Sequence, residues 1–140
     1  MMKGAHSYTF GIIKPTSFYE AGGIVSLLIK AELSIDLMIC RQLTMEEAQE
    51  IYAPHKDGDF FISLCEYMCS GNVYLLRLTH PSKDAVKIWR DLMGATNPEK
   101  AKRGTIRAIY GRSLRENAVH GSDSAESATR ELEILENILK

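Results

Sequence analysis

Three shortages narrow what this chain can be. It has three cysteines, an odd number that cannot make a disulfide framework, so we interpret them as buried free thiols in a reducing compartment rather than as a metal or redox site. No apolar run approaches the roughly 20 residues that cross a bilayer, and the first ten residues lack the apolar segment of a secretory signal. The net charge is only −1, which argues against a general binder of nucleic acids or membrane surfaces. We therefore expect a soluble, cytoplasmic protein.

Several common devices for binding nucleotides and metals are also missing. The chain has neither a G-x-x-x-x-G-K-[S/T] phosphate loop nor a G-x-G-x-x-G turn. His6, His55 and His80 have no ligand spacing with one another or with the cysteines, so we expect no protein-held metal. A nucleotide that binds here must be held by other means.

The composition is that of one ordinary globular domain. The chain has 140 residues, of which 45% are apolar and 25% charged, so we expect a single domain over residues 1–140 with a well-formed core. Apolar spacing and breaker residues predict strands at 7–14, 34–42, 72–79 and 117–120, and helices at 20–32, 44–52, 59–69, 82–93 and from 123 onward.

The order of these elements predicts the fold class. Strands and helices follow as β-α-β, helices, then β-α-β-α, which favours an α+β fold: a ferredoxin-like, four-stranded antiparallel sheet (βαββαβ) covered by helices. Two S/T/D-x-x-E capping boxes, Thr44–Glu47 and Asp123–Glu126, mark helix starts. Residues 95–116 read as a long irregular stretch with one helical turn near Ile106, and loops of that length are often functional.

The stretch N-A-V-H-G-S-D-S, residues 117–124, is the most informative segment. It sets His120 at the end of a short apolar run, before Gly121 and a cluster of helix-capping residues. We expect an imidazole at an exposed turn beside a helix N-terminus, where free N–H groups favour phosphate. Gly121 would let the backbone approach a ligand closely. A nucleophilic or acid–base histidine at an anion site is the leading interpretation.

Other polar residues are weaker candidates when taken singly. Lys14 ends the first strand and can place a cation in a cleft, although a solvated lysine at a strand end is the better interpretation from its own residues. Arg90 and Arg107 suit phosphate oxygens, yet each alone is better read as a surface arginine. Thr96 lies in the turn G-A-T-N-P, where it can bond backbone or ligand.

Aromatic residues flank the segment 54–59. Phe61 has helical spacing with Leu64, so we expect it in the core. Phe60 falls outside that stripe and can be an exposed stacking surface, with helix capping or loop packing as the alternative.

These motifs together resemble the nucleoside diphosphate kinase family. N-A-V-H-G-S-D-S matches its active-site signature nearly completely, and I-I-K-P, F-F-x-S-L-x-E-Y-M-x-S-G, G-A-T-N-P and G-T-I-R follow in family order and spacing. The resemblance covers about residues 8–133. It implies an enzyme that moves the γ-phosphoryl of a nucleoside triphosphate, mainly ATP, to a nucleoside diphosphate through a phosphohistidine. Mg²⁺ would be bound through the nucleotide phosphates, and stacking would tolerate many bases.

The resemblance also implies a catalytic set. His120 would accept the phosphoryl group, with Tyr52 beside it. Glu131 would hold the second ring nitrogen of His120, either itself or through Ser122.

The remaining implied residues would bind the nucleotide. Lys14 would reach the sugar hydroxyl and the transferring phosphate, and Asn117 would bond the sugar and help position that phosphate. The phosphates would be held by three more side chains, those of Arg90, Thr96 and Arg107. The base would stack on Phe60, and Leu114 would pack on its other face.

Some positions depart from the family pattern. Thr16 stands where the family usually has Asp, Gly58-Asp59 where it has Arg-Pro, and Pro54 where an acidic residue is common. None is a proposed catalytic group. The resemblance further implies a homo-oligomer, a hexamer first and a tetramer second, with a dimer as the minimum because a small sheet leaves an open edge.

Two rival functions stay open from the sequence. The first is a nucleotide-binding regulatory or scaffolding protein of the same fold without catalysis, which would be expected to carry a damaged catalytic set. The second is a ligand-binding ferredoxin-like domain with no nucleotide role, in which His120 is a packing histidine. It predicts no stabilisation by nucleotides in a melting assay.

Overall fold

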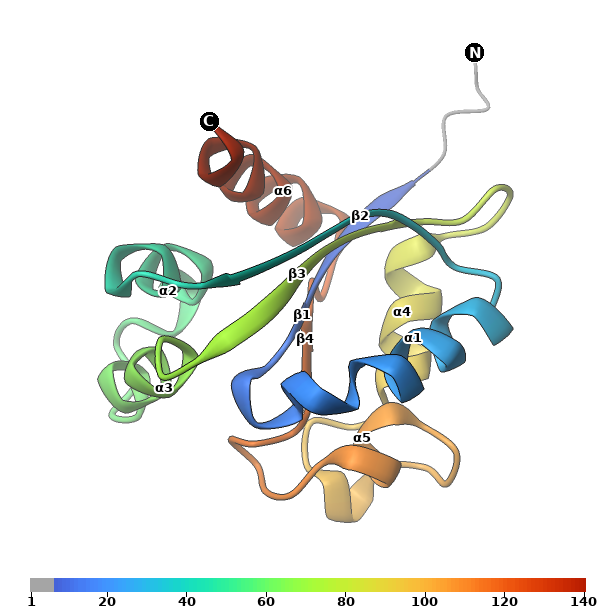
Figure 1. The fold of residues 1–140 in the computed structure, drawn as a ribbon, viewed down its shortest axis with the longest axis horizontal. Helices are drawn as coiled ribbons and strands as arrows, with labels where there is room; N and C mark the ends of the chain where they lie inside the picture. The colour runs from blue at the N-terminus through green and yellow to red at the C-terminus, as the bar shows by residue number, and fades with distance from the viewer. Residues whose placement is uncertain (1–6) are drawn as a thin grey trace.

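The computed structural model describes residues 7–140 and contains one four-stranded sheet. Its strands lie in the order β2-β3-β1-β4, and each neighbouring pair is antiparallel (Figure 1). The strands are β1 (Tyr8–Ile13), β2 (Ser34–Gln42), β3 (Asn72–Thr79) and β4 (Val119–Gly121). The predicted α+β, ferredoxin-like architecture is confirmed, and the strands predicted at 34–42 and 72–79 have the predicted bounds.

Helices fill the connections between the strands, and the last helix follows the last strand. The α-helices are α1 (Ala21–Lys30), α2 (Met45–Ile51), α3 (Phe61–Met68), α4 (Ala85–Met93), α5 (Ile106–Tyr110) and α6 (Ala125–Leu139). Short 3₁₀ helices are η1 (Pro15–Glu20), η2 (Ala53–His55) and η3 (Pro98–Lys100). The predicted box at Thr44 is present, since the Glu47 amide donates to the Thr44 hydroxyl and the Thr44 amide donates to the Glu47 carboxylate.

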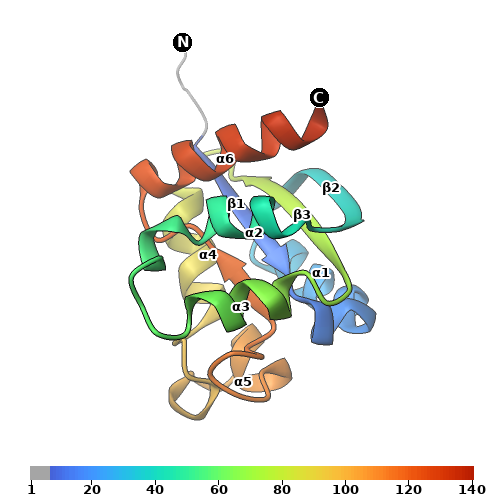
Figure 2. The same ribbon diagram turned by 90° about the vertical axis from the view of Figure 1, so that its left-hand side faces the viewer.

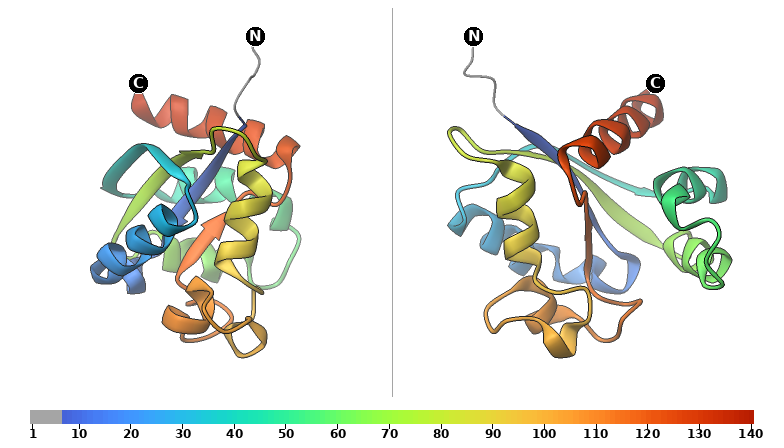
Figure 3. Two further views of the ribbon diagram at one scale, coloured as in Figure 1. Left: turned by 90° about the vertical axis from the view of Figure 1, so that its right-hand side faces the viewer. Right: turned by 180° about the vertical axis from the view of Figure 1, so that it is seen from behind.

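The sheet separates two apolar cores. Helices α2, α3 and α6 cover one face, where Phe10 and Ile12 of β1 meet their buried side chains (Figures 1 and 2). Helices α1, α4 and α5 cover the other face, where Ile13 packs with Trp89 of α4 (Figure 3). Because β1 is paired on both edges and covered on both faces, all its residues after Tyr8 are buried.

Several predicted boundaries are wrong by a few residues. The helix predicted from residue 82 begins at Ala85, because Asp84 is the cap and its carboxylate accepts from two backbone N–H groups. The helix predicted over 20–32 is α1, which spans Ala21–Lys30, and the 3₁₀ helix η1 precedes it. The helix predicted from residue 59 begins at Phe61.

The last helix also starts later than predicted. Ser124, not Asp123, is its cap, and the Ser124 hydroxyl accepts from the backbone N–H of Ser127. The carboxylate of Asp123 accepts instead from the Ser127 hydroxyl at 2.6 Å. The capping box predicted at Asp123–Glu126 is therefore wrong, although a helix does follow it.

The stretch 95–116 contains more structure than predicted. Besides the helical turn expected near Ile106, which is α5, it holds η3. Thr105 caps α5 through its hydroxyl.

Two predictions concern the N-terminus. His6 and most of the stretch interpreted as lacking a secretory signal lie outside the described residues. Within residues 7–140, none of the helices has both the length and the apolar character needed to span a membrane.

Candidate active site

His120 lies within the edge strand β4 rather than at an exposed turn. Its backbone is opposite Ile12 of the inner strand β1, and 15% of its side chain is accessible. The predicted exposed turn is wrong because the apolar run continues into the sheet, so β4 spans Val119–Gly121 instead of 117–120. The imidazole is therefore held by the sheet and open to ligands on a small part of its surface.

A buried carboxylate fixes one ring nitrogen of His120. Nε2 lies 2.8 Å from Oε1 of Glu131, which projects from α6. Ser122 donates to the same Oε1 at 2.9 Å, so it does not stand between the two residues. A carboxylate accepts hydrogen bonds, which assigns the proton of the neutral ring to Nε2 and leaves the lone pair on Nδ1.

Two aromatic rings frame the imidazole. The ring centroids of Tyr52 and His120 are 5.1 Å apart at 67°, and those of Phe10 and His120 are 5.9 Å apart at 65°. Burial, and after it the charge of Glu131, raises the pKa of Tyr52 well above its usual range, so the phenol keeps its proton. Its hydroxyl is buried and has no hydrogen-bond partner within residues 7–140, so a donor beside His120 stays free.

Lys14 is buried at the end of β1. Its side chain is withdrawn from solvent, with the residue only 5% exposed, so the interpretation of a solvated strand-end lysine is wrong. Nζ donates to Oδ1 of Asn117 at 2.7 Å and to the carbonyl of Arg115 at 3.2 Å. Burial, followed by repulsion from Arg107 and Arg115, lowers the pKa of Lys14 to about 7.

Asn117 joins Lys14 to the turn that carries Thr96. Its Nδ2 donates to the carbonyl of Thr96 at 2.9 Å, while Oδ1 accepts from Lys14. The next residue, Ala118, has φ of +76°, a left-handed conformation that costs a non-glycine residue roughly 1–2 kcal/mol. Its carbonyl accepts from the backbone N–H of Lys14 at 2.9 Å, so pairing with β1 holds the strained residue in place.

Arg107 is buried, and the surface interpretation is wrong for it. Its guanidinium donates to the carbonyls of Gly94, Asn117 and Val119, at 3.0, 3.3 and 2.8 Å. Burial lowers its pKa to about 10, which leaves it charged at neutral pH. A fixed cation is thus built against β4 by backbone carbonyls that lie 10 to 13 residues away in sequence.

Arg90 and Thr96 are exposed, as their single-residue interpretations allowed. Arg90 donates to the carbonyl of Asp123 at 3.1 Å, so its guanidinium lies where α6 begins. A hydrogen bond from Ser127 holds the pKa of Asp123 below its usual range. Because they are exposed, the side chains of Arg90 and Thr96 can both contact a ligand that enters from solvent.

The predictions that Phe60 is exposed and that Phe61 is in the core are both confirmed. Phe60 is 49% exposed, whereas Phe61 belongs to the core. A Cβ added at Gly58 would lie 2.9 Å from the Phe60 ring, so the missing side chain leaves room for that ring over the loop. Leu114 is 63% exposed on the segment that follows α5.

The structure requires glycine at position 121 for a different reason from the predicted close approach of a ligand. A Cβ there would lie 2.4 Å from Cε of Met93 and 2.5 Å from Nε1 of Trp89. The space is therefore filled by α4, which packs against β4, and it is not available to a ligand.

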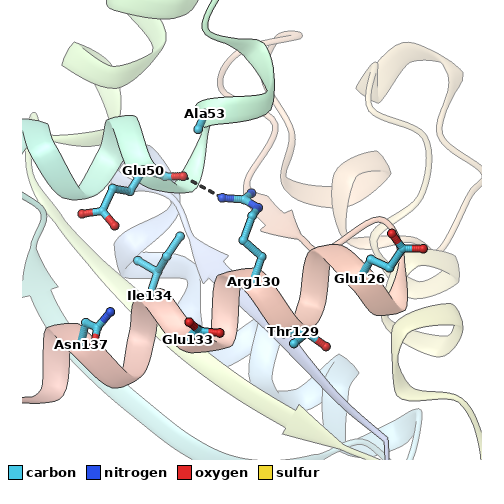
Figure 4. Close-up of a pocket in the computed structure, with 8 residues that line it drawn as sticks. All are labelled: Glu50, Ala53, Glu126, Thr129, Arg130, Glu133, Ile134 and Asn137. Atoms are coloured by element: carbon cyan, nitrogen blue, oxygen red, sulfur yellow. Dashed lines mark hydrogen bonds between the residues drawn. The ribbon is translucent and has the colours of Figure 1, made fainter.

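Some contributing residues carried no sequence signal. Arg115 meets Lys14 through its carbonyl and Ser63 of α3 through its guanidinium. Arg130 donates to the carbonyls of Glu50 and Ile51 and so ties α6 to the end of α2, beside a surface hollow lined by residues of α2, η2 and α6 (Figure 4). That hollow does not include His120. No motif predicts such contacts, because they depend on tertiary placement.

The three cysteines are free thiols, and Cys65 is buried as predicted. The prediction of burial is wrong for Cys40, which is exposed, and for Cys69, which is half-buried. Residues 7–140 hold no group of three or more histidine, cysteine or acidic side chains arranged to bind a metal ion. The cations and amides around His120 suit anions instead.

Comparisons with known proteins agree with one another. A family model described as nucleoside diphosphate kinase matches residues 7–137. The nucleoside diphosphate kinase of Chlamydia muridarum is 47% identical over 126 residues, which cover 89% of this chain and 88% of the relative. That of Lawsonia intracellularis is 42% identical over 127 residues, covering 89% and 91%.

Solved structures give the same result. The Aquifex aeolicus nucleoside diphosphate kinase superimposes with a TM-score of 0.87 at 34% identity, covering 94% of this chain and 95% of the other. The Halobacterium salinarum enzyme, in complex with CDP, gives 0.86 at 34% identity, covering 92% and 86%.

Fold and similarity together define a nucleotide-dependent phosphotransferase of the α+β class. The chain belongs to the nucleoside diphosphate kinase family. Its function is therefore the reversible transfer of the terminal phosphoryl group of a nucleoside triphosphate to a nucleoside diphosphate.

Proposed function

We propose that this transfer runs through a phosphohistidine on Nδ1 of His120, in two half-reactions. The observation that carries the proposal is the 2.8 Å contact between Nε2 and Glu131, because it directs the proton to Nε2 and frees Nδ1. The guanidinium of Arg107 donates to the carbonyl of Val119, the residue before His120, so a fixed cation is held against the same strand. A neutral ring with a directed lone pair is the form that attacks phosphorus.

The bonds balance over the two half-reactions. Nδ1 attacks the γ-phosphorus of MgATP, an N–P bond forms, and the bond to the β–γ bridging oxygen breaks to release MgADP. A second nucleoside diphosphate then attacks the same phosphorus, and its terminal oxygen takes the phosphoryl group while the electron pair returns to Nδ1. Glu131 stabilises the Nε2–H dipole throughout, since the ring carries more positive charge when phosphorylated.

We propose that the polar residues around His120 bind the nucleotide. Lys14 and Asn117 would contact the sugar hydroxyl and the transferring phosphate, supported by their mutual 2.7 Å contact. The phosphates would be bound by Arg90, Thr96 and Arg107. Their charge would offset the negative charge of the transferring group, which is the main demand of phosphoryl transfer. Mg²⁺ would enter as part of the substrate, held by phosphate oxygens.

Tyr52 would act beside the nucleophile. Its buried, unpartnered hydroxyl supports a role as a hydrogen-bond donor to the phosphoryl group on His120. Ser122 would steady Glu131 through their shared oxygen.

The base would lie between Phe60 and Leu114. Both side chains are exposed apolar groups, and neither reads a donor–acceptor pattern, which supports broad base tolerance. ATP would be the main donor because it is the most abundant triphosphate in cells, and the enzyme would maintain NTP and dNTP pools.

We further propose that residues 1–140 form one domain, active in the cytoplasm as a homo-oligomer, first a hexamer and second a tetramer. The open edge of β2 supports self-association. Nucleoside di- and triphosphates would be its ligands, with no specific nucleic acid or membrane partner.

The covalent intermediate is tested by intact mass. The wild type and His120→Ala are incubated briefly with ATP and Mg²⁺. We expect the wild type alone to gain one phosphate, which acid removes and added GDP discharges. Two-dimensional NMR of the phosphorylated protein should find the phosphate on Nδ1.

Other outcomes would contradict the proposal. No mass gain in the wild type, while ATP still raises its melting temperature, would mean that transfer does not use a protein intermediate. A phosphate on Nε2 would overturn the role assigned to Glu131.

A further inference from the structure

A hydrogen-bonded chain links the two segments that carry Phe60 and Leu114. Nη2 of Arg115 donates to the Ser63 hydroxyl at 2.6 Å, and that hydroxyl donates to the carbonyl of Phe60 at 3.0 Å. Arg115 follows Leu114 directly, on the segment between α5 and β4. Ser63 lies in the first turn of α3, which begins after Phe60. The loop after α5 and the start of α3 are therefore joined next to the two exposed apolar side chains. Figure 2 shows α3 and the segment after α5 as neighbours in the fold.

The same arginine is anchored on its other side. Its backbone carbonyl accepts from Nζ of Lys14 at 3.2 Å, and Lys14 contacts Asn117 next to β4. One residue thus meets the phosphate side through its carbonyl and the base side through its guanidinium. The hydrogen bond from Arg115 to Ser63 has an ionised donor, which makes it stronger than a neutral one.

We infer that Arg115 and Ser63 are positioning residues that set the width of the base slot. The inference rests on the proposed function in one respect, that the base lies between Phe60 and Leu114. Neither residue needs to touch the nucleotide. The bridge keeps the two walls at a fixed separation in the free protein, so less ordering remains to be done when a nucleotide binds.

The bridge should affect ligands that have a base and spare those that have none. ADP and inorganic tripolyphosphate form such a pair, because both present phosphates but only ADP fills the slot. Ser63→Ala removes the bridge and leaves every charge in place. Arg115→Met removes the bridge together with a cation that repels Lys14. Because tripolyphosphate has no base, any change in its affinity in this variant comes from the lost charge and not from the lost bridge.

Dissociation constants of ADP, GDP, CDP and tripolyphosphate are measured by calorimetry for the wild type, Ser63→Ala, Arg115→Met and the double variant. We expect Ser63→Ala to weaken all three nucleotides by a similar factor, roughly three- to tenfold, the range of one net hydrogen bond. Tripolyphosphate should bind as it does to the wild type. For ADP, the double variant should be no weaker than Arg115→Met, because the two residues act through one contact.

Matched controls come from the same chain. Ser26→Ala removes an exposed hydroxyl from α1, and Arg103→Met removes an exposed cation from the loop before α5; neither side chain makes a hydrogen bond within residues 7–140. Both should leave ADP binding unchanged. Steady-state kinetics add a second readout: Ser63→Ala should raise KM for the nucleoside diphosphate and keep kcat within about twofold of the wild type.

Two results would overturn the inference. One is a Ser63→Ala protein that binds ADP as the wild type does, and the other is an equal loss of affinity for ADP and tripolyphosphate. Failure of the proposed function looks different, since the wild type would then gain no phosphate from ATP. The binding comparison still decides the bridge in that case, because it requires no turnover.

Discussion

Lys14 is the residue whose charge depends most on its surroundings. Its pKa is about 7 in the folded protein and 10.5 in the unfolded chain, because burial removes the hydration of the ammonium group. Between these values the unfolded chain binds more protons at this site than the folded protein does. The free energy of unfolding therefore rises with pH across this window, and below pH 7 the cost of the buried charge is fully present.

This sign can be measured directly. In urea unfolding from pH 7 to 10, the wild type should gain stability relative to Lys14→Met, at a slope of at most about 1.4 kcal/mol per pH unit from this one site. The difference between the two proteins cancels the titration of other groups. Parallel stability curves would show that Lys14 keeps an ordinary pKa.

Glu131 is the second residue whose replacement is informative. In Glu131→Gln, the buried partner of Nε2 becomes neutral and can turn its amide N–H toward the ring, which favours the wrong tautomer. We expect single-turnover phosphorylation by ATP to slow by on the order of 10²-fold, with nucleotide affinity nearly unchanged. The exposed Glu133→Gln on the same helix is the control and should react at the wild-type rate. A normal rate in Glu131→Gln would remove its assigned role.

Single residues were the hardest to interpret from sequence. Taken alone, Lys14 and Arg107 read as solvated side chains, yet both are buried, because Asn117 and backbone carbonyls distant in sequence supply their hydrogen bonds. Arg90 has the same residue type and is exposed. Local sequence gives the charge of a side chain, whereas burial is decided by the partners that the fold brings to it.

The short strand β4 has a strained backbone residue before it and a closely packed glycine at its end. Ala118 is strained before it, and Gly121 at its end lies against Trp89 and Met93. His120 is between them. A strand this short has few hydrogen bonds of its own, so these contacts fix where the imidazole lies.

Gly121→Ala should disturb both stability and activity. The new methyl group would overlap Trp89 and Met93, so we expect a loss of about 1–3 kcal/mol in unfolding free energy and a lower kcat as β4 shifts. Gly22→Ala is the contrasting variant, since a Cβ there meets nothing within 4 Å in the described structure. It should stabilise α1 by up to about 1 kcal/mol and leave kcat unchanged. Equal stability of the two variants would contradict the packing assigned to Gly121.

Elements with strong local signals were predicted well. Thr44 and Glu47 form the predicted capping box, because both halves of that motif are local. At the last helix the overlapping letters D-S-A-E and S-A-E-S offer two caps, and the structure uses Ser124. The choice between them depends on the Asp123–Ser127 contact, which the motif alone does not specify.

The sheet as a whole leaves β2 at an open edge. This strand is nine residues long, and Met38 in its middle is 37% exposed. If the proposed oligomer forms through this edge, sedimentation velocity should find the wild type as a dimer or larger at micromolar concentration. Met38→Lys should shift it toward monomer. Leu139→Lys, on the exposed end of α6, is the control and should sediment as the wild type does. A monomeric wild type would contradict the proposed homo-oligomer.

The whole site is assembled from residues far apart in the chain. Lys14 and Asn117 are 103 positions apart, and they meet because β1 and β4 are neighbours in the sheet. The pattern of strands and helices predicted the fold class, and the motifs predicted the candidate site residues. The distances, the bridge through Arg115 and the packing of Gly121 could not be predicted, because each depends on how the layers dock.

If Lys14 binds the phosphates as proposed, its lowered pKa would make nucleotide binding consume hydrogen ions. In mildly alkaline solution the free protein holds much of this amine uncharged, and an arriving polyphosphate would favour its ammonium form. Each nucleotide bound would then draw a fraction of a hydrogen ion from the buffer and return it on release. The heat of binding measured by calorimetry would change with the ionisation enthalpy of the buffer. The affinity for both the donor and the acceptor nucleotide would then depend on the local pH.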